Sequence, residues 1–356
     1  MKKISFILIT FIFISFTLYG CLASDVPQEP VENTPTPAPV PESPANPGNT
    51  PEPTPELTPE PIITGENISI VVTIFPQYDW VHQILGEKAE FKEITLLINN
   101  RIDLHSYQPS IRDITTISAS DLFIYVGGES DDWVEAVLEQ ATNPDMVVIN
   151  LMDALGERVL IDEEIDDGHH HHHHHHDDDL DEHVWLSLRN AIILVDVIAD
   201  ALSALDPELA DYYKENAALF SALLNELDLE YTQAVSNASR DTLLFADRFP
   251  FRYLLHDYGL NFYAAFSGCS AETEASFRTI TFLARKLDEF SLTTVLVTES
   301  ANISIAETVI SNSASGDQQI LVLDSMQSSN DDDRARGITF LTIMENNLSV
   351  LKEALD

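Results

Sequence analysis

The globular part of the chain opens with ISIVVTI, residues 68–74, a continuous run of apolar and β-branched side chains. Such a run is typical of a strand that is buried on both faces of a parallel sheet. The next two residues, Phe75 and Pro76, open a helical pattern that stops at Gly86. Further strands are predicted at 94–98, 121–126 and 146–149, with helices at 110–118 and 132–140. The sequence therefore predicts an alternating α/β lobe of ordinary domain size.

Helical periodicity dominates the middle of the chain, at residues 187–205 and 207–238. The pair Asp206-Pro207 is a start signal, with Asp as the N-cap and Pro in the first turn. Further on, strands are predicted at 242–246, 262–266, 294–298 and 320–323, and helices at 250–257, 273–289, 303–313 and 333–354. We therefore predict an α/β fold with two open parallel-sheet lobes joined by one long helix. Ligands are expected in the cleft between the lobes, beyond the carboxyl ends of the strands.

The first 65 residues have the pattern of a targeting segment followed by a spacer. Lys2 and Lys3 precede an apolar stretch, and Leu18-Tyr19-Gly20-Cys21 resembles a bacterial lipobox. We predict a lipoprotein signal peptide over residues 1–20 and a lipidated Cys21 that holds the chain at a membrane. The alternative is an uncleaved membrane anchor with an incidental cysteine. Most of the 18 prolines follow, so residues 21–65 are predicted to carry the lipid and a disordered tether.

The predicted globular segments are an N-terminal lobe at 66–186, a helical pair at 187–238 and a C-terminal lobe at 239–356. Charge and cysteine content exclude several classes of protein. The 356 residues include 59 acids and 18 bases, which argues against nucleic-acid binding because phosphates need basic partners. Two cysteines are too few for a disulfide scaffold or a four-cysteine zinc module. Once Cys21 is lipidated, Cys269 is either a small buried hydrophobe or a metal-binding thiolate. We expect a monomer.

One uninterrupted histidine run lies inside an acidic segment, residues 162–182. It comprises His169, His170, His171, His172, His173, His174, His175 and His176. Such a composition cannot bury apolar surface, so we predict a solvated loop whose imidazoles collect divalent metal ions. Two alternatives are a solvated loop without function and an engineered purification tag, which the internal position between acids disfavours.

Two further histidines are predicted in loops where ligand sites form. His105 follows a predicted strand, and His183 precedes a predicted helix. Two histidines with carboxylates match the ligand set of zinc, and oxygen ligands also admit manganese. Spacing alone leaves open a surface or capping role for each of them. His82, on an amphipathic helix, and His256, near a helix end, are predicted to be structural.

Five short segments, taken in order, resemble the zinc- and manganese-binding solute-binding lipoproteins of bacterial ABC transporters. They are VVTIFPQY (71–78), LHSYQPS (104–110), EHVWL (182–186), DYGL (257–260) and VLDS (322–325). The resemblance implies a periplasmic-binding-protein-like fold of the metal-binding type, with a rigid linking helix. It also implies an extracytoplasmic, lipid-anchored subunit that passes Zn²⁺ to a permease and its ATPase, with Mn²⁺ as the alternative metal. The acidic histidine-rich loop is similar to that of the zinc branch.

The resemblance further implies a set of metal ligands. His105 and His183 match the two histidine ligands of the N-terminal lobe, and Asp324 matches the aspartate of the C-terminal lobe. The remaining position falls on Arg248, whose guanidinium stays cationic and cannot bind a metal. We expect a local shift that makes Asp247 the ligand, with water or Glu299 as alternatives. Arg248 would then orient Asp247 or Asp324.

Two other functions are weighed against transport. A zinc hydrolase is disfavoured because the chain lacks His-Glu-x-x-His, Gly-x-Ser-x-Gly and a phosphate-binding loop. A closed ligand shell would also leave no reactive water, so we expect no enzyme activity. A metal-binding adhesin or storage lipoprotein without a transport role is compatible with the sequence.

Overall fold

The computed structural model describes residues 68–99, 102–162, 180–268, 274–328 and 331–356. The predicted signal peptide, Cys21, the tether, the histidine run and Cys269 lie outside these residues. The described residues between 68 and 356 belong to one compact unit.

Among the helices that the structure describes, none is long and apolar enough to cross a membrane.

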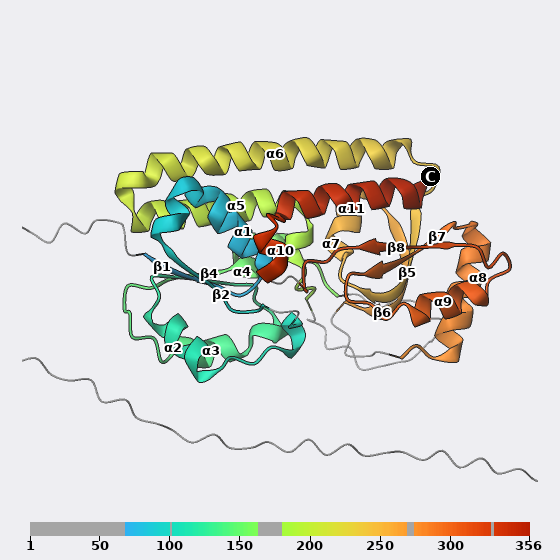
Figure 1. The fold of residues 1–356 in the computed structure, drawn as a ribbon, viewed down its shortest axis with the longest axis horizontal. Coiled ribbons are helices and arrows are strands. Elements are labelled where there is room, and N and C mark those ends of the chain that lie inside the picture. The colour runs from blue at the N-terminus through green and yellow to red at the C-terminus, as the bar shows by residue number, and fades with distance from the viewer. Residues whose placement is uncertain (1–67, 100–101, 163–179, 269–273, 329–330) are drawn as a thin grey trace, which may run out of the picture. The chain divides into compact units, whose positions relative to one another are not determined.

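The N-terminal lobe contains a four-stranded parallel sheet in the order β2-β1-β3-β4 (Figure 1). Ile70 and Val72 face one core, which includes Trp80 of α1, while Val71 faces the other core, with Ile117 of α2. Both faces of β1 are therefore buried, as its unbroken apolar run predicts. The elements are β1 (Ser69–Val72), α1 (Phe75–Leu85), β2 (Glu93–Leu96), α2 (Ile111–Ala119), β3 (Leu122–Tyr125), α3 (Trp133–Leu138), β4 (Val147–Asn150) and α4 (Leu151–Leu155).

The C-terminal lobe repeats this design with the parallel order β6-β5-β7-β8. Leu244 faces a core with Leu283 of α8 and Val309 of α9, and Phe245 faces the opposite core, which includes Met344 of α11. The elements are β5 (Thr242–Phe249), α7 (Arg252–Tyr258), β6 (Asn261–Ser267), α8 (Phe277–Phe290), β7 (Thr294–Thr298), α9 (Ser304–Ser311), β8 (Gln319–Leu323), α10 (Asp331–Ala335) and α11 (Phe340–Leu355).

Two helices, α5 (Leu188–Leu205) and α6 (Ala210–Asn237), connect the lobes. The 28-residue α6 contacts α1 of the first lobe and α11 of the second, and it lies alongside both in Figure 1. The buried Tyr231 of α6 donates a hydrogen bond to the carbonyl oxygen of Met344 at 2.6 Å. One hydrophobic core therefore runs through both lobes, and the predicted fold of two parallel-sheet lobes with a long helix is confirmed.

The predicted helix at 333–354 is wrong in one respect, because it is two helices. Gly337 adopts φ +75° between α10 and α11, a backbone conformation that L side chains rarely adopt. Thr339 then caps α11 by accepting a hydrogen bond from the backbone N–H of Thr342.

The start of α6 also differs from the prediction. Pro207–Leu209 forms a 3₁₀ turn, and the side chain of Asp206 does not cap it. Instead, this buried carboxylate accepts hydrogen bonds from Lys92 and Tyr213, both at 3.1 Å. The charge of Lys92 from the first lobe is a stronger partner than a backbone amide.

Candidate metal centre

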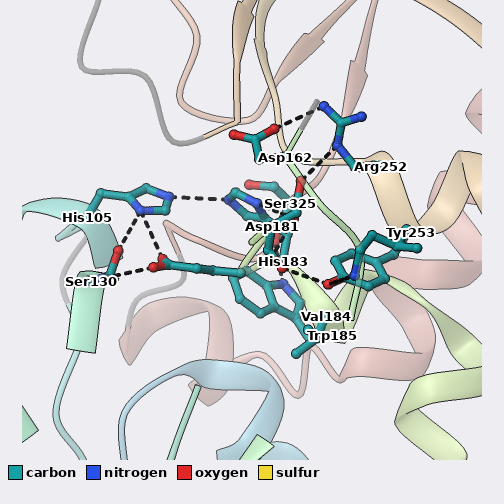
Figure 2. A network of polar contacts seen from close by, with 12 residues as sticks. His105, Ser130, Asp162, Asp181, His183, Val184, Trp185, Arg252, Tyr253 and Ser325 are labelled. Atoms are coloured by element: carbon teal, nitrogen blue, oxygen red, sulfur yellow. Dashed lines mark hydrogen bonds and ion pairs between the residues drawn. The ribbon is translucent and has the colours of Figure 1, made fainter. Parts of the chain in front are cut away.

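The side chains of His105 and His183 point toward each other (Figure 2). His105 lies in the 3₁₀ turn η3 (Leu104–Ser106), and His183 directly precedes η6 (Val184–Leu186), which leads into α5. Their Nε2 atoms are 3.3 Å apart. The His183 side chain is fully buried, and that of His105 is 14% exposed. The structure thus brings together two residues that are separated by 78 positions in the sequence.

Oxygen atoms hold the other ring nitrogen of each histidine. Nδ1 of His183 lies 3.0 Å from Oδ1 of Asp181. Nδ1 of His105 lies 3.3 Å from Oε2 of Glu182 and 2.7 Å from Oγ of Ser130. An ionised carboxylate only accepts hydrogen bonds, so these partners assign the hydrogen to Nδ1 in each neutral ring. Both Nε2 lone pairs then point toward the space between the rings.

The two orienting carboxylates favour their ionised form. Burial would raise the pKa of Asp181, but the electrostatic attraction to His183, the hydrogen bonds that His183 donates and the charge of Arg252 bring it below its usual value. Burial acts in the same direction on Glu182, and hydrogen bonds from His105 and Ser130 outweigh it, so the pKa of Glu182 is also lowered. Both groups therefore remain acceptors at neutral pH.

Two glycines allow the histidine pair to pack closely. A Cβ on Gly268 would lie 2.8 Å from Cε1 of His183 and 2.8 Å from the carbonyl oxygen of Phe249. A Cβ on Gly128, where φ is +82°, would lie 2.4 Å from Oε1 of Glu182. Larger residues at either position would displace His183 or the carboxylate that orients His105.

Asp324 directly follows β8 and lines a cavity of about 500 Å³ together with Glu299 and Asp333. Burial, followed by the negative charge of Glu299, raises the pKa of Asp324 to about 7. Three residues later, Nε2 of Gln327 lies 3.4 Å from Nε2 of His105. The loop that carries Asp324 therefore already reaches the histidine pair.

Asp247 and Arg248 lie at an irregularity in β5, which extends three residues beyond its predicted end. The register against β6 shifts between Phe245 and Arg248, as at a β-bulge that redirects side chains. Oδ2 of Asp247 accepts hydrogen bonds from the backbone N–H and hydroxyl of Thr298. Arg248 donates a hydrogen bond to Asp103 at 2.6 Å, so the expected contact with Asp247 or Asp324 is replaced by one to the other lobe.

In the described part of the chain, no three His, Cys, Asp or Glu side chains form a group that could hold a metal ion. The structure therefore joins His105 to His183 and leaves Asp324 and Asp247 outside that pair. Nδ1 of His82 lies 2.8 Å from the carbonyl oxygen of Tyr78, and His256 is exposed in the last turn of α7.

The residues that support the histidines were not identified from the sequence. One local signal was present: an aspartate stands two positions before each histidine, in Asp103-Leu104-His105 and Asp181-Glu182-His183. Ser130 and Gln327 carry no such signal, because they reach His105 from segments distant in the chain.

Comparisons with known proteins identify the family of the chain. The family profile described as "Zinc-uptake complex component A periplasmic" (ZnuA) matches residues 70–354. The zinc-binding lipoprotein AdcA of Streptococcus pneumoniae is 30% identical over 291 residues, which are 81% of this chain and 56% of AdcA. The high-affinity zinc uptake system protein ZnuA of Bacillus subtilis is 28% identical over 82% of this chain and 88% of its own length. The chain thus spans a little over half the length of AdcA.

Solved structures show the same similarity. The Zn(II)-bound ZnuA-like domain of S. pneumoniae AdcA is 28% identical with a TM-score of 0.64, and the match covers 82% of this chain and 99% of that domain. The metal-dependent lipoprotein YcdH of B. subtilis is 25% identical with a TM-score of 0.66, over 81% of this chain and 99% of YcdH. The chain belongs to the ZnuA family, described as component A of the periplasmic zinc-uptake complex.

Proposed function

We propose that this chain is the extracytoplasmic zinc-binding subunit of an ABC transporter. It captures Zn²⁺ between its two lobes and delivers the ion to a membrane permease that an ATPase powers. The observation that carries this proposal is the 3.3 Å separation between Nε2 of His105 and Nε2 of His183. Two nitrogens bound to one tetrahedral zinc ion, each at about 2.0–2.1 Å, lie about 3.3–3.4 Å apart. Both lone pairs therefore fit a single ion.

The carboxylates behind the rings support the same chemistry. A metal-binding histidine usually gives its other ring N–H to a carboxylate or a carbonyl, which fixes the ring and raises its basicity. Asp181 and Glu182 supply such partners for His183 and His105. A cation between the rings would also remove the repulsion between two facing lone pairs. The names of the relatives AdcA and ZnuA specify zinc, which supports zinc over manganese.

Asp324 is the proposed ligand from the C-terminal lobe. Its loop contacts His105 through Gln327, so a small closure of the lobes would carry the Asp324 carboxylate toward the ion. Because α6 packs against both lobes, this closure is a limited hinge or tilt.

Asp247 is the proposed fourth ligand, with water or Glu299 as alternatives. Oδ2 of Asp247 is held by Thr298, while its Oδ1 makes no hydrogen bond to the residues that the structure describes. Both oxygens of Glu299 already accept hydrogen bonds from Ser325 or Ser328. Asp247→Asn keeps an acceptor for Thr298 and removes the charged ligand oxygen. We expect weaker zinc binding by calorimetry, and an unchanged affinity would assign the position to an alternative.

The segments outside the described residues have proposed roles in delivery. A lipidated Cys21 would anchor the chain at the outer face of the membrane, with residues 22–65 as the tether. The histidines at 169–176 would raise the local zinc concentration and pass ions inward to the tighter site. Ile161 and Leu180, which flank this loop, form a β-bridge, and His183 follows three residues later. The two described residues on either side of the histidine run therefore lie next to each other, shortly before His183 in the chain.

Zinc titration of the purified chain by calorimetry tests the site. His105→Ala and His183→Ala are expected to abolish the tight site, because each removes one of two converging nitrogens. His256→Ala, which removes an exposed imidazole at the end of α7, should leave it intact. Tight binding that survives both of the first two substitutions would contradict the proposal, and competition with Mn²⁺ identifies the preferred metal.

The delivery role needs a test in cells. Deletion of the gene is expected to cause a growth defect in low zinc that added zinc repairs. Normal zinc uptake after deletion would instead favour the adhesin or storage role. The match to a family of uptake components supports binding without a catalytic step.

A further inference from the structure

Each of the two histidines is preceded by an aspartate that holds its backbone. Oδ1 of Asp103 accepts the backbone N–H of His105 at 3.0 Å, and Oδ1 of Asp181 accepts the backbone N–H of His183 at 2.9 Å. Two separate segments of the N-terminal lobe thus use the same Asp-x-His turn. In each turn the second carboxylate oxygen, Oδ2, remains for another partner.

Each of those second oxygens forms an ion pair with an arginine of the C-terminal lobe, and the pair at Asp103 is also hydrogen-bonded. Nη1 of Arg248, in β5, lies 2.6 Å from Oδ2 of Asp103. Nε of Arg252, at the start of α7, lies 3.4 Å from Oδ2 of Asp181 (Figure 2). The two arginines are four positions apart in one segment, yet their partners lie in different loops of the other lobe. One C-terminal segment therefore holds both histidine turns.

Arg252 also binds the other end of the histidine-rich segment. Its Nη2 donates a hydrogen bond to Oδ1 of Asp162 at 2.9 Å. The adjacent Tyr253 accepts the backbone N–H of Leu160 and donates its hydroxyl to the carbonyl oxygen of Asp181. Arg252 and Tyr253 together contact both of the described segments that flank residues 163–179.

Burial makes the Arg252 contact important for the geometry of the pair. The side chains of Asp181 and His183 are fully buried, and that of Arg252 is 9% exposed. Without Arg252, Oδ2 of Asp181 would lose its cationic partner, and the buried carboxylate would be free to rotate. The rotation would move the acceptor away from Nδ1 of His183, and the Nε2 lone pair would lose its fixed direction.

We infer that Arg248 and Arg252 are positioning residues for the two metal-binding histidines, each acting across the lobe boundary through the aspartate that precedes its histidine. The inference rests on the proposed zinc site, and it adds a role for the residue that stands where the family resemblance implies a ligand. At that position, Arg248 makes a contact with the N-terminal lobe, where the resemblance implies a bond to the metal. The arginines then hold the histidines converged before the ion arrives, which reduces the reorganisation that binding requires.

The test compares Arg248→Gln, Arg252→Gln and Arg252→Lys with the matched control Arg189→Gln. Arg189 also donates hydrogen bonds, to the carboxylate of Asp228 and to the carbonyl oxygen of Asp257, but it lies outside the site. We expect the two glutamine variants to lose zinc affinity, by less than the roughly 10–100-fold expected for groups that contact the metal ligands directly. Arg252→Lys should recover part of the loss, because it keeps the charge but cannot span Asp162 and Asp181. Arg189→Gln should bind zinc as the unaltered chain does.

A second measurement separates positioning from general destabilisation. The visible absorption of bound Co²⁺ reports the coordination geometry, and it should change in Arg248→Gln and Arg252→Gln but not in Arg189→Gln. Unchanged zinc affinity and an unchanged cobalt spectrum in folded Arg248→Gln would overturn the inference. The ion pair between Arg248 and Asp103 is partly exposed, so Arg248→Gln can be tested even if Arg252→Gln does not fold. Zinc binding that survives His105→Ala would instead refute the proposed function.

Discussion

Nδ1 of His183 lies 3.0 Å from Oδ1 of Asp181, and neither side chain is exposed to solvent. The same carboxylate oxygen accepts the backbone N–H of His183, so one oxygen fixes both the loop and the ring. This arrangement directs Nε2 of His183 toward His105 and links the fold of residues 181–183 to the proposed metal site.

Removal of this carboxylate should weaken zinc binding. We expect Asp181→Ala to lower the affinity by about 10–100-fold, because His183 loses its fixed orientation. Asp206→Ala is the matched control, since Asp206 is also a buried, ion-paired aspartate but contacts Lys92 and Tyr213. Calorimetry measures both variants, and equal losses in the two would contradict a specific role for Asp181.

Zinc affinity should fall as the pH drops below neutral. Burial and Glu299 raise the pKa of Asp324 to about 7, so at pH 6 this carboxyl carries a proton that zinc must displace. Calorimetry at pH 6 in buffers of different ionisation enthalpy should show that the unaltered chain releases up to about one more proton than Asp324→Asn. Equal proton release by the two proteins would remove Asp324 from the ligand set.

The raised pKa of Asp324 also predicts how the stability of the metal-free protein depends on pH. An aspartate whose folded pKa is raised stabilises the fold most below its unfolded pKa, about 3.9, and this contribution is lost as the pH rises through about 7. The unaltered chain should therefore lose stability between pH 4 and pH 8 relative to Asp324→Asn. Urea unfolding of both proteins across this range measures the difference, and parallel curves would contradict it.

Gly268→Ala should disturb the metal centre directly. The added Cβ would lie 2.8 Å from both the ring of His183 and the carbonyl oxygen of Phe249, so the ring must move. Gly259→Ala is a useful comparison, because its φ of +68° makes alanine strained while no atom lies within 4 Å of the new Cβ. Both variants should unfold more easily, by about 1–3 kcal/mol, but only Gly268→Ala should also lose zinc affinity.

Deletion of residues 168–179 should distinguish zinc binding by the histidine run from zinc binding at the His105–His183 pair. Calorimetry and metal analysis should show fewer zinc ions per chain and one remaining tight site, because the loop imidazoles form the looser sites. Loss of tight binding as well would make the histidine run a primary site.

The regular elements follow from local patterns and were largely predictable. The predicted helix at 75–85 and the strand at 294–298 agree with α1 and β7, because apolar spacing is a property of neighbouring residues. The break between α10 and α11 was missed, although Gly337 stood in the predicted helix as a signal for it. The sites of His105 and His183, in loops beyond strand ends and before helices, were predicted for the same local reason.

The contacts between distant segments could not be predicted from local sequence patterns. Arg248 and Asp103 are 145 positions apart, and Gln327 reaches His105 over 222 positions. Such pairs depend on how the two sheets pack against α5, α6 and α11, which no local period encodes. Composition and periodicity were enough to predict the two lobes and the long helix, while the choice of His105 and His183 as metal ligands came from the family resemblance and stays a prediction. The direction of each imidazole, and the contact of Arg248 with Asp103, arise from packing because they require groups that are brought together from distant segments of the chain.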